Sequence, residues 1–149
     1  MKKPKYWDVW RAVRDTKQQF TNAEVQAALG KSHLSKLGGL PLDETYWGVP
    51  LETWQLILAY NGTDKKRYVK DTFDCDNFAI LFAGSVADKF SINGAGIVID
   101  YSGGHAYSAL LVATETGELA FATIEPQNDE FVIRTEGMYD AEFGFIMLA

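Results

Sequence analysis

The sequence predicts an α+β fold with N-terminal helices, a buried helix that starts at the cysteine, and a C-terminal, mostly antiparallel sheet. In the first half, apolar residues recur at helical spacing over residues 6–15 and 51–60. In the second half, five short segments are rich in β-branched or aromatic residues and are separated by turns. Between the two halves, a helical apolar pattern begins at Cys75, and we expect the sheet to wrap around this helix.

The three helices predicted in the first half have recognisable ends. The first spans residues 6–15. Asn22 can cap the second helix, which Gly30 would end. Residues 31–50 are punctuated by Gly, Pro and Ser and are expected to form a connection. The third helix spans residues 51–60 and is closed by an Asn-Gly pair, and all three are expected to serve packing.

Cys75 is expected to face inward at the N-terminus of the fourth helix. Asp74 or Asp76 can cap this helix. The helix terminus and a nearby imidazolium would favour the thiolate form of the cysteine, whereas two flanking carboxylates would oppose it. We therefore expect both carboxylates to point away into capping or loop hydrogen bonds. The apolar stripe that continues from the cysteine consists of Ala79, Phe82, Val86 and Phe90.

The strand segments bring a histidine and a glutamate together. The turn at residues 115–117 is expected to be a three-residue hairpin loop with its glycine in the left-handed conformation. The resulting register places His105 opposite Gln127 and makes Glu125 a diagonal neighbour on the same sheet face. The five predicted strands span residues 95–101, 104–114, 118–125, 130–135 and 142–148.

Composition limits the classes of function. The chain has 149 residues, a formal net charge of −6, one cysteine and two histidines. It predicts one domain over residues 1–149, with no cofactor and no metal site. The acidic balance argues against nucleic acid, and the lack of an apolar run of membrane-spanning length argues against a membrane. The N-terminus lacks the apolar stretch of a signal peptide, so a cytoplasmic location is expected unless cell lysis releases the protein. The oligomeric state is not predicted.

The order cysteine, histidine, carboxylate indicates a nucleophile, its base and the group that orients the base. Cys75, His105 and Glu125 are therefore the candidate catalytic residues. Gln127 is a rival orienting group because the same register brings it to His105. The alternative is that the cysteine is an inert core residue and His105 a structural hydrogen-bond centre. The other histidine, His33, is expected to lie on the surface.

These residues resemble the transglutaminase-like branch of the papain-fold cysteine hydrolases. The resemblance covers residues 68–127 and depends on three motifs, Asp74-Cys75-Asp76, Gly104-His105-Ala106 and Glu125-Pro126-Gln127. The third motif departs from the Asp that is common in that branch. The resemblance implies a single papain-like or transglutaminase-like domain. It also implies an oxyanion site formed by the cysteine N–H and a donor from an upstream helix, for which Gln55 and Trp54 are candidates.

The resemblance implies a thiol hydrolase or acyl transferase, such as a cysteine protease, acting on amide bonds of a peptide or protein substrate through a thioester. A second interpretation is a catalytically inactive papain-fold module that binds or inhibits a partner. A third, similar to CHAP and NlpC proteins, is a peptidoglycan amidase or endopeptidase. A structural protein of a virus or another assembly is compatible with the size and acidity, although no motif indicates it.

Overall fold

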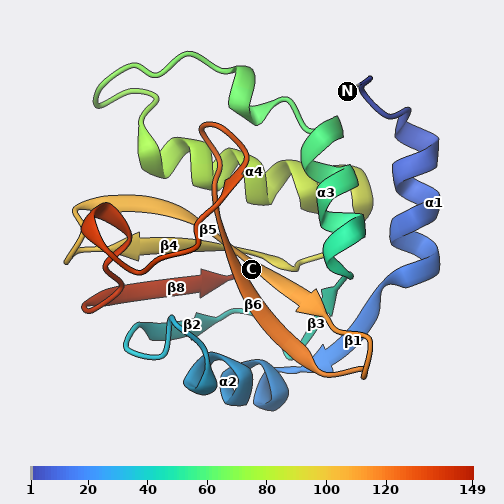
Figure 1. The fold of residues 1–149 in the computed structure, drawn as a ribbon, viewed down its shortest axis with the longest axis horizontal. Helices are drawn as coiled ribbons and strands as arrows, with labels where there is room; N and C mark the ends of the chain where they lie inside the picture. The colour runs from blue at the N-terminus through green and yellow to red at the C-terminus, as the bar shows by residue number, and fades with distance from the viewer. Residues whose placement is uncertain (1) are drawn as a thin grey trace.

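The computed structural model describes residues 2–149 and builds them around a six-stranded mixed sheet (Figure 1). The strand order is β2-β8-β4-β5-β6-β7. Neighbouring strands are antiparallel except for β2 and β8, which run parallel. The strands are β2 (Gly38–Pro41), β4 (Ala95–Asp100), β5 (His105–Ala113), β6 (Leu119–Glu125), β7 (Glu130–Phe131) and β8 (Gly144–Leu148). A separate antiparallel pair consists of β1 (Gln18–Thr21) and β3 (Thr45–Gly48).

Within residues 2–149, four α-helices and two short 3-10 helices accompany the sheets. The α-helices are α1 (Tyr6–Thr16), α2 (Asn22–Lys31), α3 (Leu51–Tyr60) and α4 (Cys75–Phe90), and the 3-10 helices are η1 (Thr63–Lys65) and η2 (Gly137–Tyr139). Thr21 caps α2 and forms a capping box with Glu24, so the predicted Asn22 cap is wrong by one residue. Asp74 caps α4, as expected.

The helices cover the two faces of the large sheet with separate apolar clusters. On one face, α1, α3 and α4 pack against Leu110 and Ile124. On the other face, α2 packs against Tyr107, Leu111 and Ile146. Because side chains alternate between the faces of a strand, neighbouring residues of β5 belong to different clusters. The central strand therefore connects both halves of the core.

The predicted β5–β6 register is confirmed. Gly117 has φ +80 and donates its N–H to the carbonyl of Thr114, as a three-residue hairpin loop with a left-handed glycine requires. The strands then pair from Ala113 opposite Leu119 to Ser108 opposite Ile124. This register carries the end of β6 to the beginning of β5, where the two candidate side chains lie.

The prediction of a purely helical first half is wrong. Three strands lie in the first half, at residues 18–21, 38–41 and 45–48. The segment 38–41 contains two glycines and a proline, so it carries no strand pattern of its own. It becomes a strand because its backbone pairs in parallel with β8, about a hundred residues later in the chain. Pairing at this sequence separation leaves no local signal in residues 31–50.

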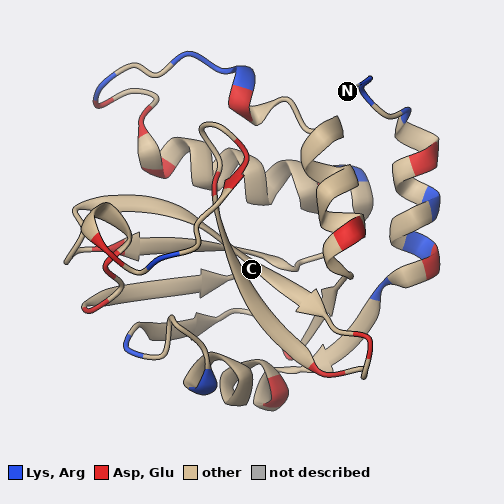
Figure 2. Ribbon diagram, in the orientation of Figure 1, with Lys and Arg blue, Asp and Glu red and all other residues tan. Residues whose placement is uncertain are grey.

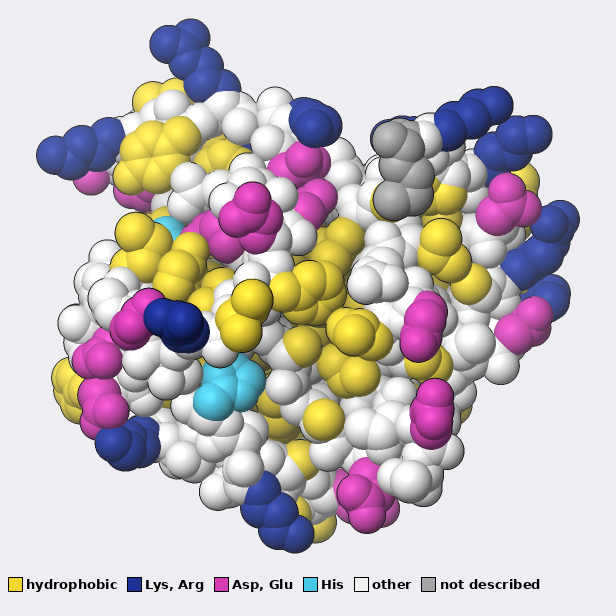
Figure 3. All heavy atoms as spheres, in the orientation of Figure 1, with side chains coloured by type: hydrophobic (Ala, Val, Ile, Leu, Met, Phe, Trp, Pro, Cys, Tyr) yellow, Lys and Arg dark blue, Asp and Glu magenta, His cyan; other side chains and the backbone are white. Residues whose placement is uncertain are grey.

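Charged side chains lie mainly at the periphery of the molecule. Figure 2 shows Lys and Arg on α1 and on the connection between α3 and α4, and few on the strands of the large sheet. On the face in Figure 3, hydrophobic side chains gather at the centre while Lys, Arg, Asp and Glu occur mostly around it. Within residues 2–149, no helix combines the length and the apolar character needed to cross a membrane.

A buried carboxylate holds the turn between β4 and β5. Asp100 is 1% exposed, and its two oxygens accept four hydrogen bonds. The donors are Ser102 Oγ at 2.6 Å, the Gly103 N–H at 2.9 Å, Tyr107 Oη at 2.8 Å and the Ala141 N–H at 2.8 Å. Burial would raise the pKa of Asp100, but these hydrogen bonds outweigh it and hold the pKa below its ordinary value.

We predict that Asp100→Ala lowers the free energy of unfolding by about 3 kcal/mol, because it leaves several buried donors without an acceptor. Urea unfolding measures this cost. Asp88→Ala is the matched control, since Asp88 is exposed on α4, and it should change stability by less than about 0.5 kcal/mol. Equal effects of the two substitutions would show that the Asp100 hydrogen bonds do not carry stability.

Candidate functional site

The clearest polar site is a histidine–glutamate pair at the beginning of β5. His105 Nε2 lies 2.6 Å from Glu125 Oε2, and both side chains are largely buried, with 11% and 7% of their surface exposed. The turn before His105 makes this placement possible. Gly104 has φ +63, and Gly103 packs so closely on the Met138 carbonyl that no side chain would fit. The backbone therefore delivers the imidazole to the end of β6.

Glu125 accepts three hydrogen bonds in all. Tyr139 Oη donates to the same oxygen as His105, at 2.7 Å, and the Gln127 N–H donates to the other oxygen at 3.1 Å. Burial alone would raise the pKa of Glu125, but these hydrogen bonds outweigh it and hold the pKa below its ordinary value. The glutamate is therefore a buried carboxylate suited to orienting the imidazole.

Two tyrosine rings fix the position of the imidazole. The Tyr139 ring lies edge-on to His105 with centroids 5.6 Å apart, and the Tyr107 ring lies 5.9 Å away. Burial, together with the hydrogen bond to Glu125, raises the pKa of Tyr139, so this phenol is a hydrogen-bond donor. Tyr139 follows an irregular segment, where no strand register relates it to Glu125, so its contact could not be predicted from the sequence.

Cys75 is the first residue of α4 and is half-buried. Figure 1 shows that the N-terminal end of α4 and the beginning of β5 lie at the same end of the molecule, and α4 contacts β5 directly. Among residues 2–149, however, no hydrogen bond joins the Cys75 sulfur to His105 or Glu125. The structure therefore brings together the histidine and the glutamate, and places the cysteine at the same end without a hydrogen bond to them.

The carboxylates on either side of Cys75 interact with each other. A hydrogen bond with Asp76 lowers the pKa of Asp74, and the same hydrogen bond, helped by burial, raises the pKa of Asp76. Asp74 Oδ2 also accepts the Asp71 N–H at 3.0 Å. Asp74 thus points into loop and capping hydrogen bonds, as expected, while Asp76 is engaged with Asp74.

The other residues named from the resemblance lie in different environments. Trp54 is fully buried, and its indole N–H already donates to the Leu111 carbonyl at 2.9 Å. Gln55, the next residue of α3, is exposed. Gln127 contributes its backbone N–H to Glu125. His33 is exposed, as expected, and its Nε2 lies 2.6 Å from Thr123 Oγ1.

A second pair of carboxylates lies beside the turn that follows Glu125. The N–H of Asp129 donates to the Glu125 carbonyl at 2.8 Å. The side chain of Asp129 lines a cavity of about 340 Å³ together with Asp64 and Lys65. Burial raises the pKa of Asp129 to about 7, with a further contribution from the charge of Asp64. Among residues 2–149, no cluster of three or more His, Cys, Asp or Glu side chains could hold a metal ion.

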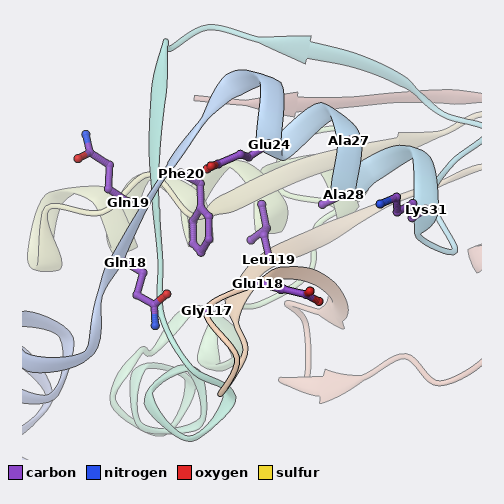
Figure 4. Close-up of a pocket in the computed structure, with 10 residues that line it drawn as sticks. All are labelled: Gln18, Gln19, Phe20, Glu24, Ala27, Ala28, Lys31, Gly117, Glu118 and Leu119. Atoms are coloured by element: carbon purple, nitrogen blue, oxygen red, sulfur yellow. The ribbon is translucent and has the colours of Figure 1, made fainter.

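A cavity of about 450 Å³ lies between β1, α2 and the β5–β6 hairpin (Figure 4). Neither the histidine–glutamate pair nor Asp129 lines it. Phe20 and Leu119 line it from the two strands, and Glu24 and Lys31 from α2. The sequence does not predict this cavity, because residues 18–21 carry no clear strand pattern of their own. It is larger than the other cavities described for residues 2–149, which range from about 220 to 360 Å³.

Comparison with known proteins identifies the family. Residues 16–147 match the family model described as "Ricin-type beta-trefoil lectin C-terminal domain". The chain belongs to this family of lectin C-terminal domains. Because the match begins in α1 and ends in β8, it includes every strand of both sheets. A comparison with the sequences of curated proteins found no match.

Two solved structures have the fold of this lectin C-terminal domain. One is a complex of PSL1a with E64, with a TM-score of 0.65 and 23% identity. The other is Polyporus squamosus lectin bound to the human-type influenza-binding epitope Neu5Acα2-6Galβ1-4GlcNAc, with a TM-score of 0.61 and 23% identity. Each match covers 87% of this chain and 51% or 49% of the solved chain, respectively. The lectin C-terminal domain thus spans about half the length of these structures.

These findings correct the resemblance to papain-fold cysteine hydrolases. The transglutaminase-like assignment is wrong, because the matching family and both solved structures are lectins. The papain-like fold class is wrong as well, and the lectin C-terminal domain has the mixed sheet described above. Three functional interpretations are wrong too, because they depended on the papain-fold family: the peptide-directed hydrolase, the cysteine protease and the peptidoglycan amidase. The inactive papain-fold module is closer, but it did not anticipate a lectin. A spaced Cys, His and Glu is too short a pattern to assign a family.

We predict that Asp129→Asn stabilises the protein above neutral pH. An Asp pKa raised from about 4 to about 7 means that the folded state binds the extra proton, so stability falls as pH rises through this window. Asparagine cannot ionise and tolerates φ 61. The gain should be largest above about pH 7, with an upper limit of about 4 kcal/mol, and it should vanish near pH 4. Urea unfolding of Asp129→Asn and of the exposed control Asp88→Asn tests this, and equal curves would contradict it.

Proposed function

We propose that this chain is one part of a glycan-binding protein. The match of residues 16–147 to a lectin C-terminal domain carries this proposal. The structure of Polyporus squamosus lectin with a sialylated trisaccharide supports it, because that lectin shares the fold of this chain. The expected partner is therefore a glycan rather than a peptide or protein substrate.

We predict that the protein binds at least one oligosaccharide in a survey of immobilised glycans. Neu5Acα2-6Galβ1-4GlcNAc belongs in the survey because it is the epitope in the related structure. Saturable binding that free glycan competes away is the expected result. Heat-unfolded protein is the control, since retention by the unfolded chain would indicate adhesion. Absence of competable binding to every glycan would contradict the proposed function.

A second function is supported by the buried histidine–glutamate pair. We propose that Cys75, His105 and Glu125 form a reactive thiol site in which Glu125 orients the imidazole. The Nε2 of His105 is occupied by Glu125, which leaves Nδ1 for the cysteine. Cys75 lies at the N-terminus of α4, where backbone N–H groups are not used within the helix. The PSL1a complex with E64 supports testing this site with an electrophile.

The proposed step with E64 is epoxide opening. The Cys75 thiolate attacks a carbon of the epoxide, a carbon–sulfur bond forms, and the carbon–oxygen bond breaks. The alkoxide then takes a proton from the His105 imidazolium, which had received it from the thiol. Glu125 stabilises the imidazolium and keeps the ring in one orientation.

We predict that His105→Ala slows alkylation of Cys75 by iodoacetamide at least about tenfold at neutral pH, because the thiolate loses its partner. His33→Ala is the matched control, since it removes the other histidine and should leave the rate unchanged. Mass spectrometry of the adduct measures the rate, and Cys75 is the only thiol that can react. E64 should likewise add one equivalent to the native protein and none to Cys75→Ala. Equal alkylation rates for the two histidine variants would contradict the proposed thiol site.

A further inference from the structure

We propose that the N-terminal residues and α1 form a surface that binds the anionic headgroups of a lipid bilayer. This basic aromatic surface consists of the lysines in residues 2–5, Trp7 and Trp10 on α1, and the basic residues of the connection at 65–70. The inference goes beyond the proposed function, because it does not depend on glycan binding. The proposed contact is peripheral, with side chains that meet the bilayer at the level of the headgroups.

Positive charge is concentrated in two segments of the chain, although the whole protein is acidic. Residues 2–17 and 65–70 contain ten of the fourteen Lys and Arg residues but only two of the twenty Asp and Glu residues. Figure 2 shows these segments along the upper and right-hand parts of the molecule. Lys2 and Lys3 line the same cavity as Lys65, so the two segments meet. A negatively charged surface therefore attracts this side of the protein.

Most of these ten cations are available to a ligand. Three of them pair with a neighbouring carboxylate, namely Arg11, Arg14 and Lys65. The other seven form no salt bridge within residues 2–149, and they are Lys2, Lys3, Lys5, Lys17, Lys66, Arg67 and Lys70. All of these seven except Lys17 are exposed. A cation without a carboxylate partner keeps its attraction for an anionic headgroup.

Trp7 adds an exposed aromatic side chain beside these charges. It is 61% exposed, although an indole is among the side chains that gain most from burial. Its ring lies edge-on to the rings of Tyr6 and Trp10, with centroids 5.0 and 5.9 Å apart. Indole rings favour the interface between water and lipid, because they combine an apolar body with a polar N–H.

α1 holds Trp7 in a fixed position. Val9 and Val13 are buried, and α1 packs against α3. Tyr6 Oη donates to the Lys89 carbonyl at 2.8 Å. The ring of Trp7 is therefore already positioned before a ligand binds, which lowers the entropic cost of binding. Most of α1 precedes residues 16–147, so the match to the lectin family does not account for this surface.

The arrangement favours a bilayer over a nucleic acid. Cations and aromatic rings occur together in sites for single-stranded nucleic acids as well, but there they line a positively charged groove that follows the strand. The cavity shared by Lys2, Lys3 and Lys65 also contains Asp64, whose carboxylate repels a phosphate backbone that enters it. Exposed cations around a tryptophan match a flat anionic surface instead.

The test measures sedimentation of the protein with vesicles of phosphatidylcholine alone and with vesicles that also contain phosphatidylserine. Neither vesicle carries a glycan, so glycan binding does not contribute. We expect sedimentation with the phosphatidylserine vesicles only, together with a blue shift of tryptophan fluorescence. Salt at about 0.5 M should abolish it, because salt screens exposed charges. Equal binding to both vesicles, or binding to neither, would overturn the inference.

Two double variants with the same net charge locate the surface. Lys3→Glu with Lys5→Glu reverses two of its charges, whereas Lys31→Glu with Lys36→Glu reverses two exposed charges at and after the end of α2. Each cation near an anionic surface contributes about fivefold in affinity. The first variant should therefore weaken vesicle binding at least about 25-fold, and the second less than about threefold. Equal binding by the two variants would place the contact elsewhere.

Trp7→Ala tests the aromatic contact, and Phe143→Ala is its control. Phe143 is 67% exposed and precedes β8, which begins at the side of the molecule opposite α1 (Figure 1). Trp7→Ala should weaken vesicle binding and lose the fluorescence shift, and Phe143→Ala should retain both. Circular dichroism checks that each variant is folded. Binding of duplex DNA as tight as that of the phosphatidylserine vesicles would assign the surface to a nucleic acid and overturn the inference.

Discussion

The buried carboxylate of Asp100 is the interaction on which the site end of the molecule depends. Its four donors come from the β4–β5 turn, from the core tyrosine of β5 and from the segment that precedes β8. One anion therefore holds the turn after β4 and the irregular segment before β8 against the core tyrosine of β5. The cost of burying the charge is offset only because every donor is present. The turn that results holds His105 at the first position of β5, opposite Asp100 in the β4–β5 ladder.

The same end of the sheet contains a second buried carboxylate that depends on the first. Tyr107 donates to Asp100, and its ring packs edge-on against Tyr139, with centroids 5.1 Å apart. Tyr139 in turn donates to Glu125, which holds His105. The two carboxylates are thus linked through a pair of tyrosines. A substitution that weakens the hydrogen bonds of Asp100 should therefore shift the His105 imidazole through the two tyrosine rings, because close-packed interiors transmit displacements.

The part of the site that could be predicted is the part that a single turn determines. Residues 115–117 specify a hairpin loop, and the period-two alternation then places His105 and Glu125 on one face. Tyr139 and Asp100 could not be found in this way, since their contacts cross between irregular segments. The strands at residues 38–41 and 45–48 were missed for a similar reason. Residues 38–41 are glycine-rich and become a strand by pairing with β8. Residues 45–48 form a short strand by pairing with β1.

The family could not be inferred from the three candidate residues, because a hydrogen-bonded histidine and glutamate satisfy a structural need as well as a chemical one. A buried imidazole requires an acceptor for its N–H, and a buried glutamate requires donors. Glu125 and His105 meet both requirements with each other. The reactivity of the thiol is therefore a separate question from the pairing, because Cys75 makes no hydrogen bond to either partner among residues 2–149. The histidine–glutamate pair lies at the beginning of β5, whereas the hairpin cavity lies at the other end of this strand.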